Sequence, residues 1–255
     1  MRLLSGRWLA GLVGLFAFGA GPAHAAMDQT WIAVEGSDAA SCTSLDPCAS
    51  LAKAASVTAP SGTIFVMDSG FYGPVTLTQA VSIRSEMGRP VMIAQITINA
   101  GPADKFTIAD VDLEGTATVA GIAYPYGIKI NGALELLVQN CGIRYYMSGD
   151  ATAISINSAY QVRVTLDKTT VYANQIGVLV TDNGGTGHLK LFNSLLMANY
   201  TAGVRVVNAG NDVIMVGNNI LGSTKALDLQ NGGVGKSYGG NTLTSGDIPS
   251  SLATY

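Results

Sequence analysis

The chain has 255 residues, of which 48% are hydrophobic and 12% are charged, and 31 are glycines. This composition excludes a disordered chain and suits a tightly stacked β protein. With 14 basic and 17 acidic side chains the net charge is −3, which argues against nucleic-acid binding, because that binding depends on neutralising phosphates.

Residues 1–25 predict a secretory signal peptide. Arg2 and Arg7 supply the positive start, and an apolar stretch then leads to the small-x-small motif Ala-His-Ala, which ends at Ala25. The apolar stretch is shorter than the about 20 residues that a membrane-spanning helix needs, and no later segment is long enough either. We therefore expect no membrane span and an exported protein, periplasmic or extracellular, that is cleaved near Ala25.

Residues 26–255 predict a single domain, whose first part, 26–62, covers one end of the fold. Cys42 and Cys48 lie six positions apart, and in an oxidising compartment this spacing indicates a local disulfide. A metal pair is the alternative, but no second cysteine pair or histidine lies nearby. The third cysteine, Cys141, is expected to be a buried structural thiol.

A short helix is predicted at about 47–58. Asp46 is the expected N-cap, and Pro47 would occupy the first helical position, where its missing N–H costs nothing. Apolar residues at 48, 51, 52 and 55 then lie on one helical face. A helix there would cover the first coil of a repetitive fold, whose ends need capping.

Short strands follow the helix, with an apolar residue at every second position and glycine or polar residues at the bends. The runs are 63–67, 75–77, 81–84, 91–93, 96–98 and 106–108. Five similar segments then recur every 23 to 26 residues. Their aligned apolar anchors are Ile128, Ile154, Val178, Val204 and Leu227. A period of this size indicates a solenoid, and three short strands per period indicate a parallel β-helix over 63–243, followed by a tail at 244–255.

Four of the repeats place an asparagine shortly before the last strand of the coil. These residues are Asn140, Asn193, Asn218 and Asn241, and Lys168 stands where the second repeat should have one. Asparagine tolerates the left-handed backbone of a sharp bend, and its amide can bond to its copies in neighbouring coils. We therefore predict one structural ladder from these four asparagines.

The repeats, the bend asparagines and the helix resemble the right-handed parallel β-helices of the pectate-lyase-like superfamily, from about Trp31 onward. This resemblance implies an all-β, right-handed parallel β-helix with a short N-terminal α-helical cap. The superfamily includes polysaccharide lyases, hydrolases, esterases, adhesins and proteins without known activity. Pro74 stands where similar methylesterases have a glutamate, and no polygalacturonase motif is present.

The densest acidic segment suggests a calcium site. Asp112 and Glu114 should point outward from one strand, and Arg144 should lie beside them in the next coil. Superfamily lyases hold Ca²⁺ with such carboxylates and use an arginine or lysine as the base, which makes Asp112 and Glu114 the candidate metal ligands and Arg144 the candidate catalytic residue. The alternative is a cross-strand ion pair, worth only about 0–1 kcal/mol.

Two tyrosine pairs are candidates for stacking on sugars. Tyr124 and Tyr126 flank a proline before the first clear repeat, and Tyr145 and Tyr146 follow Arg144. A tyrosine offers a flat apolar face and a polar tip, which suits carbohydrate recognition. The alternative is that a tyrosine of each pair packs onto the solenoid.

Other outward side chains form columns of opposite charge. We expect Glu135 to stack on Arg163, and Arg205 on Asp228, in adjacent coils. His188 follows Arg163 in its column. It is either a solvated surface residue or a general acid or base with Asp182 as its partner.

Two functions are compatible with these features. The first is an exported, non-catalytic β-helix that binds a polysaccharide or cell-surface glycan or serves as a structural surface module. The second is a Ca²⁺-dependent polysaccharide lyase or related carbohydrate-active enzyme. No cofactor is firmly implied, although Ca²⁺ is compatible with the acidic segment. The tail at 244–255 should cover the last coil incompletely, so that chains could associate through the C-terminal end.

Overall fold

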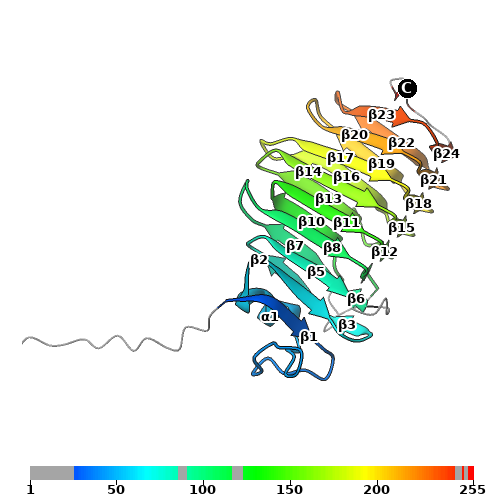
Figure 1. The fold of residues 1–255 in the computed structure, drawn as a ribbon. Coiled ribbons are helices and arrows are strands. Elements are labelled where there is room, and N and C mark those ends of the chain that lie inside the picture. The colour runs from blue at the N-terminus through cyan, green and yellow to red at the C-terminus, as the bar shows by residue number, and fades with distance from the viewer. Residues whose placement is uncertain (1–25, 86–90, 117–122, 245–248, 250–251) are drawn as a thin grey trace, which may run out of the picture.

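The computed structural model describes residues 26–85, 91–116, 123–244, 249 and 252–255. In this part of the chain, one helix and twenty-five strands follow one another as a stack of coils (Figure 1). The helix lies at the N-terminal end of the stack, and the C-terminus lies at the other end. The signal peptide predicted for 1–25 lies outside the described residues.

Three sheets run along the stack, and neighbouring strands in each are parallel. Sheet 1 comprises β1 (Met27–Ile32), β2 (Thr58–Val66), β5 (Val81–Ser85), β8 (Lys105–Ala109), β11 (Glu135–Gln139), β14 (Val162–Asp167), β17 (Gly187–Phe192), β20 (Asp212–Val216), β23 (Val234–Tyr238) and β25 (Ala253–Thr254). Sheet 2 comprises β3 (Gly70–Tyr72), β6 (Val91–Ile93), β9 (Asp112–Glu114), β12 (Gly142–Arg144), β15 (Thr170–Tyr172), β18 (Leu195–Met197), β21 (Asn219–Leu221) and β24 (Thr242–Thr244). Sheet 3 comprises β4 (Val75–Leu77), β7 (Ile96–Asn99), β10 (Tyr126–Gly132), β13 (Thr152–Ser158), β16 (Ile176–Asp182), β19 (Ala202–Val207) and β22 (Lys225–Gln230).

The chain passes through the sheets in a fixed order, from sheet 1 to sheet 2 to sheet 3. One such coil is β11, β12 and β13, and the strands of each sheet come from successive coils. Adjacent strands in such a sheet lie about 4.8 Å apart. This is the parallel β-helix that the repeats predict.

The predicted anchors align in register through the sheet 3 pairings. Ile128 pairs with Ile154, Ile154 with Val178, Val178 with Val204, and Val204 with Leu227. All five side chains are fully buried. The same column continues toward the N-terminus to β7 and β4 at Ile96 and Val75, where unequal loops hide the period in the sequence.

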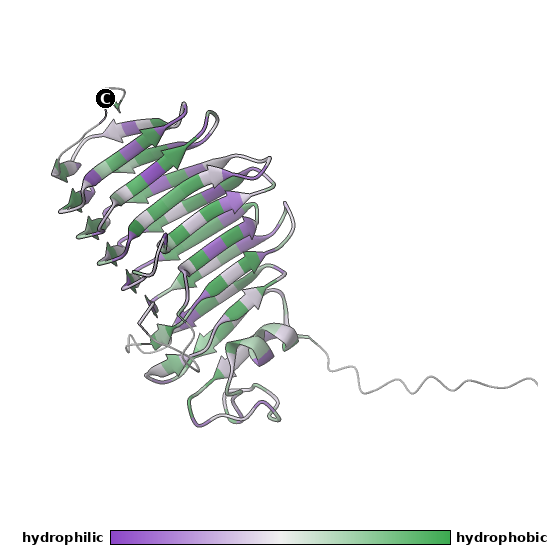
Figure 2. Cartoon of the chain, turned by 180° about the vertical axis from the view of Figure 1, so that it is seen from behind, coloured by the Kyte–Doolittle hydropathy of each residue, from purple (hydrophilic) through white to green (hydrophobic). Residues whose placement is uncertain are grey.

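Burial follows the alternation along each strand. In β11, Leu136 and Val138 are fully buried, whereas their strand neighbours are partly exposed. Hydrophobic and hydrophilic bands accordingly alternate along the strands of the stack (Figure 2). The inward residues of all three sheets form one continuous core, which is how a thin solenoid removes apolar surface from water.

The four ladder asparagines fall into two columns, which corrects the prediction of one ladder. Asn140 and Asn193 lie at the left-handed corner between sheets 1 and 2, with φ of 52° and 47°, and Lys168 shares this conformation. In the last two coils, Gly217 and Gly240 take the left-handed position instead. The asparagine then follows one place later, at Asn218 and Asn241, and points inward.

The inward column behind this corner is a ladder of mixed polar residues. Ser194 Oγ accepts the Thr169 N–H at 3.1 Å, Asn218 Oδ1 accepts the Ser194 N–H at 2.9 Å, and Asn241 Oδ1 accepts the Asn218 N–H at 2.9 Å. Each coil thus satisfies a backbone donor of the coil before it. Buried backbone groups need such partners, because an unpaired one is costly.

A second ladder, absent from the predictions, lies at the bend between sheets 2 and 3. Asn174 Oδ1 accepts the Tyr146 N–H at 3.0 Å, and Asn199 Oδ1 accepts the Asn174 N–H at 3.3 Å. Each asparagine again follows a left-handed residue, Ala173 or Ala198. The 25-residue spacing of the two asparagines is the signal that would have revealed this ladder.

The N-terminal end differs from the prediction in where its helix begins. Helix α1 spans Leu51–Val57, and its N-cap is Ser50, whose Oγ accepts the Lys53 N–H at 3.1 Å. Cys48 is instead extended, because its N–H donates to the Trp31 carbonyl of β1. A helix starting at 47 is therefore wrong, and the predicted N-cap Asp46 instead accepts from the backbone and hydroxyl of Ser41.

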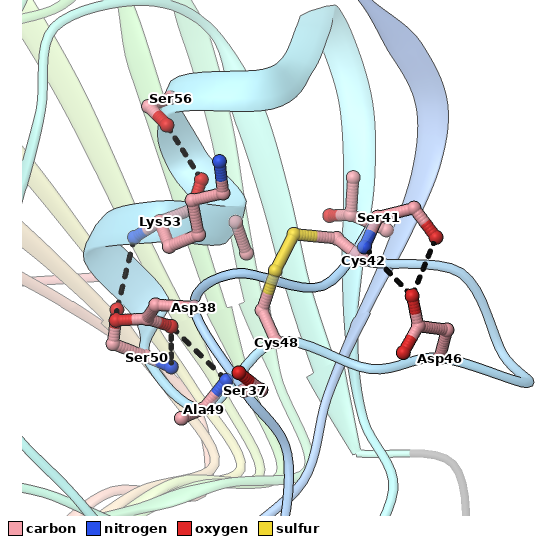
Figure 3. The surroundings of a disulfide bond; sticks show 12 residues. Ser37, Asp38, Ser41, Cys42, Asp46, Cys48, Ala49, Ser50, Lys53 and Ser56 are labelled. Atoms are coloured by element: carbon pink, nitrogen blue, oxygen red, sulfur yellow. Dashed lines mark hydrogen bonds between the residues drawn. A yellow bond between two sulfur atoms is a disulfide. The ribbon is translucent and has the colours of Figure 1, made fainter.

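The predicted disulfide between Cys42 and Cys48 is present, and both residues are fully buried (Figure 3). The disulfide closes the loop that runs beside β1. The Cys42 carbonyl accepts the Trp31 N–H, and the Cys48 carbonyl accepts the N–H of Ala33, just after β1. Helix α1 packs against β1, β2 and β4 through its buried residues Leu51 and Ala54.

At the other end, the predicted tail contributes a short strand to sheet 1. In it, Ala253 and Thr254 pair in parallel with Lys236 and Ser237 of β23. The rings of Tyr238 and Tyr255 stack at 4.9 Å. Among the described residues, no helix is long and apolar enough to cross a membrane.

Candidate functional site

The predicted charged cluster forms at the outer face of sheet 2. Strands β9 and β12 are paired so that Arg144 lies opposite Glu114, and Gly142 opposite Asp112. Leu113, between the two carboxylates, is fully buried. Both carboxylates therefore point outward, as the alternation of the strand predicts.

Arg144 bonds to both carboxylates at once. Its Nη1 lies 2.9 Å from Asp112 Oδ2, and its Nη2 lies 2.9 Å from Glu114 Oε2. The carboxylates have further donors, because Asp112 Oδ1 accepts the Gly142 N–H at 2.9 Å and Glu114 Oε1 accepts the Thr116 hydroxyl at 2.6 Å. The cluster is a closed set of hydrogen bonds.

This geometry bears on the catalytic and metal assignments, which stay predictions. Partial burial alone would lower the pKa of Arg144, but its hydrogen bond to Asp112 and the charge of that carboxylate outweigh burial, and the net shift of the pKa is upward. A guanidinium held in its charged form is a poor base. A Ca²⁺ ion between Asp112 and Glu114 would have to displace it. Across the described residues, no three His, Cys, Asp or Glu side chains gather to hold a metal ion.

Tyr146 is not a surface residue, which corrects its assignment to sugar stacking. The side chain is fully buried, and its hydroxyl donates to the Ala94 carbonyl at 2.7 Å. Burial raises the pKa of this hydroxyl far above its usual value. Tyr146 therefore fills the inward position at the bend between sheets 2 and 3, which Asn174 and Asn199 occupy in the next two coils.

The earlier tyrosine pair offers limited surface. Tyr124 is partly buried and packs against the core, which is the packing alternative for that pair. Tyr126 begins β10, and Lys129 Nζ lies 5.0 Å from the centre of its ring. A cation over one face of a ring leaves the other face for a ligand, and Arg144 has the same relation to the ring of Tyr145.

Tyr145, in contrast, belongs to an exposed group of apolar side chains. Its ring contacts Tyr172 edge-on at 5.6 Å between centroids, and Arg144 lies 5.9 Å from its centre. Tyr172 pairs in register with Arg144 on one side and with Met197 on the other. We call this set beside sheet 2, exposed except for the half-buried Tyr172, the tyrosine–methionine strip. Its members are Tyr145, Met147, Tyr172, Met197 and Tyr200.

Most of this strip was missed by sequence reasoning. Tyr172 is the outward residue one coil after Arg144, and Met197 is the outward residue of the coil after that. Extending the column of Arg144 by one period would have found Tyr172, and by two periods Met197. Burial and a hydrogen bond with Tyr145 raise the pKa of Tyr172 above its usual value. A tyrosine hydroxyl is protonated at neutral pH even without such a shift, so it can donate hydrogen bonds.

The charged columns of sheet 1 differ in detail from the predictions. His188 Nδ1 lies 2.9 Å from Asp212 Oδ1, so its predicted partner, Asp182, is wrong; Asp182 accepts from two asparagine side chains of the next coil instead. Glu135 is in register with Arg163, but its ion pair is with Lys105 at 3.4 Å.

Comparisons with known proteins found no matching family model and no matching curated protein. Two solved structures are similar. A structure described as a rhamnogalacturonan lyase has 10% identity and a TM-score of 0.49, with 82% of this chain and 67% of that chain covered. The structure of pectate lyase Pel9A has 11% identity and a TM-score of 0.46, with 88% and 78% covered.

At such low identity these likenesses concern the fold alone. The internal observations carry the assignment: three parallel sheets, one strand of each per coil, and polar ladders at the bends. In fold, this chain is a parallel β-helix.

Proposed function

We propose that this protein is exported and binds a glycan without cleaving it, through the tyrosine–methionine strip. The observation that carries the proposal is the contact between the exposed Tyr145 and the half-buried Tyr172 beside sheet 2, continued by the exposed Met197 in the next coil. Soluble proteins rarely leave contiguous apolar side chains in water without a use for them. The fold itself is compatible with a carbohydrate-related protein.

Glycan binding fits the chemistry of the strip. The ring faces of sugars are apolar and their rims carry hydroxyls, so a tyrosine can stack on the face and bond to the rim. Tyr145 is 38% exposed and Tyr200 is 68% exposed. Because strands of successive coils are about 4.8 Å apart, side chains on one column form a regular row along which an extended polymer can lie.

The closed charge cluster is the reason to propose binding rather than cleavage. A lyase on this face would need a free base and an open cation position. Arg144 and both of its carboxylates are instead satisfied by one another and by neighbouring donors. The Ca²⁺-dependent lyase is thus the alternative outcome of the test below, as is a structural surface module.

The test uses the purified chain and a panel of plant and bacterial polysaccharides, with and without Ca²⁺. Co-sedimentation measures binding, and ultraviolet absorbance detects unsaturated uronate products. We expect binding without growth of absorbance, and loss of binding in Tyr145→Ala/Tyr172→Ala. Tyr160→Ala is the matched control, because Tyr160 is 43% exposed on a different bend.

Each other result contradicts the proposal in a different way. Calcium-dependent growth of absorbance would make the protein a lyase. Binding that Tyr160→Ala and the double variant reduce equally would place the glycan elsewhere. The absence of any binding would leave a structural or surface module. N-terminal sequencing of the mature protein tests the proposed export, with a start near residue 26 expected.

A further inference from the structure

We infer that the tyrosine–methionine strip takes an uncharged glycan rather than a polyuronate. This inference rests on the proposed function and adds the class of ligand. It comes from the charged side chains that sheets 1 and 2 carry, because alternation along a strand turns every second side chain to the outer face.

Sheet 2, beside which the strip lies, carries almost no charge. Its eight strands contain only three charged side chains, Asp112, Glu114 and Arg144. These three pair with one another, and the set retains one negative charge. The one cation on this face is therefore already neutralised.

The bends that flank sheet 2 make the surroundings more acidic. Their described residues add the acidic side chains Asp68, Asp110 and Asp150 and one basic side chain, Lys168. Sheet 2 and its described bends together thus hold five acidic side chains against two basic ones. A polyuronate would bring a row of further negative charges to this surface, and juxtaposed like charges at an interface are unfavourable.

The other outward residues of β15, β18, β21 and β24 are uncharged: Thr170, Asn219, Thr242 and Thr244 are polar, and the remainder are apolar or aromatic. Tyr172, Met197 and Leu221 follow one another in register over three coils, and Leu195 lies two positions before Met197 on the same side. An uncharged sugar chain loses no ionic hydration on such a surface, whereas a carboxylate would be desolvated without a free cation to receive it.

Basic side chains gather on sheet 1 instead. Its strands carry five basic side chains, Arg84, Lys105, Arg163, Lys190 and Lys236, against four acidic ones, Asp28, Glu135, Asp167 and Asp212. A polyanion that bound this protein would find its cations there and away from the tyrosines. Variants of the basic residues of sheet 1 should therefore weaken the binding of a polyanion, whereas variants of the strip should weaken the binding of an uncharged glycan.

The test compares matched oligosaccharides that differ only in the carboxylate. Galacto- and galacturono-, gluco- and glucurono-, and manno- and mannurono-oligosaccharides of equal length are titrated calorimetrically into the full exported chain, at low and at high salt. In the pair that binds, we expect the affinity of the uronate member to be lower than that of its neutral partner by at least about tenfold, because of like-charge repulsion. Binding of the neutral member should not change with salt, since screening acts only on charges.

A charge variant sharpens the test. Asp112→Asn/Glu114→Gln keeps the shapes of both side chains and leaves Arg144 unpaired. The ratio of neutral to uronate affinity should then fall by about tenfold, the scale of one unscreened charge contact, and uronate binding should become salt-sensitive. Glu135→Gln, which frees Lys105 on sheet 1, is the control and should leave the ratio unchanged. Because both affinities come from one sample, a ratio is insensitive to a partly unfolded fraction.

Three results would overturn the inference. One is a uronate that binds more tightly than its neutral partner and is lost with Tyr172→Ala. Another is uronate binding that survives Tyr172→Ala but is lost with Arg163→Ala/Lys190→Ala, which would place the ligand on sheet 1. The third is a dimer in sedimentation that Tyr172→Ala dissociates, which would make a second copy the occupant of the strip. Absence of binding to every oligosaccharide and polymer would instead refute the proposed function itself.

Discussion

The side-chain amide of Asn174 donates a hydrogen bond to Oδ1 of Asn199, 3.0 Å away in the next coil. The same oxygen accepts the Asn174 N–H, and the amide of Asn199 donates to the Val171 carbonyl at 3.0 Å. Both side chains are fully buried. The side chain of Asn199 therefore satisfies two backbone groups of the preceding coil, and the bend between sheets 2 and 3 depends on it.

Replacing Asn199 with alanine should destabilise the solenoid. The Asn174 N–H and the Val171 carbonyl would lose their partner while buried, and we expect the free energy of unfolding to fall by about 2–3 kcal/mol. Urea unfolding followed by circular dichroism measures the change. Asn219→Ala, at an exposed position of β21, is the control and should change stability by less than about 0.5 kcal/mol. An Asn199→Ala loss no larger than that of the control would contradict the ladder.

Tyr145 and Tyr146 should separate binding from stability, although they are neighbours in the chain. Tyr146→Phe removes the hydroxyl that bonds to the Ala94 carbonyl and should lower the free energy of unfolding by about 1–2 kcal/mol with glycan binding intact. Tyr145→Ala should weaken glycan binding with little change in unfolding. Urea unfolding and co-sedimentation of both variants give the two readouts, and the reverse pattern would refute the placement of these rings.

The disulfide should stabilise the N-terminal end. Cys42→Ser/Cys48→Ser removes a constraint on a short loop, and the loop-closure model predicts a loss of about 2 kcal/mol. Thermal unfolding without reductant should show a lower midpoint for the variant, and reduction of the unmodified protein should have a similar effect. Cys141→Ala, which leaves the disulfide in place, is the comparison. An unchanged midpoint in the double serine variant would mean that the loop contributes nothing to the cooperative unit.

Cys141 should make stability fall at alkaline pH. Burial raises the pKa of its thiol from 9.0 to about 12. Between these values the thiol keeps its proton in the folded chain and loses it in the unfolded chain, so ionisation favours unfolding as the pH rises. Below pH 9 the thiol is neutral in both states and has no such effect.

The measurement is urea unfolding at a series of pH values from neutral to alkaline. The slope of stability against pH above pH 9 should be less steep for Cys141→Ala than for the unmodified chain, by up to about 1.4 kcal/mol per pH unit. The difference in slope is the readout, because tyrosines with raised pKa values, such as Tyr72, contribute equally to both proteins. Equal slopes would mean that the thiol ionises similarly in both states.

Much of the fold could be predicted because its signals are local and repeated. The anchors Ile154 and Val178 pair in register as their spacing predicts, and the outward direction of Asp112 follows from the buried position of Leu113. The start of the helix could not be predicted from capping residues alone. Pairing of Cys48 with β1 overrides the local preference of Asp46 and Pro47 for a helix start.

The candidate site was less predictable, because its members come from different coils. Arg144 was placed beside Glu114 correctly, but whether the cluster was open or closed depended on the second hydrogen bond to Asp112. Tyr172 was not considered, since it lies 28 residues after Arg144, and only strand pairing makes them neighbours.

The sequence by itself determined the coil, because period-two alternation decides which side chains enter the core and a repeat of about 25 residues stacks like on like. Only the tertiary structure decided which outward side chains meet. A difference of one position moves a residue from the corner to the core, as it does for Asn193 and Asn218 or for Tyr145 and Tyr146. Whether a residue lies at the corner or in the core depends on the backbone conformation at each bend and on the register of strands far apart in the chain. Neither can be deduced from the sequence of a single repeat.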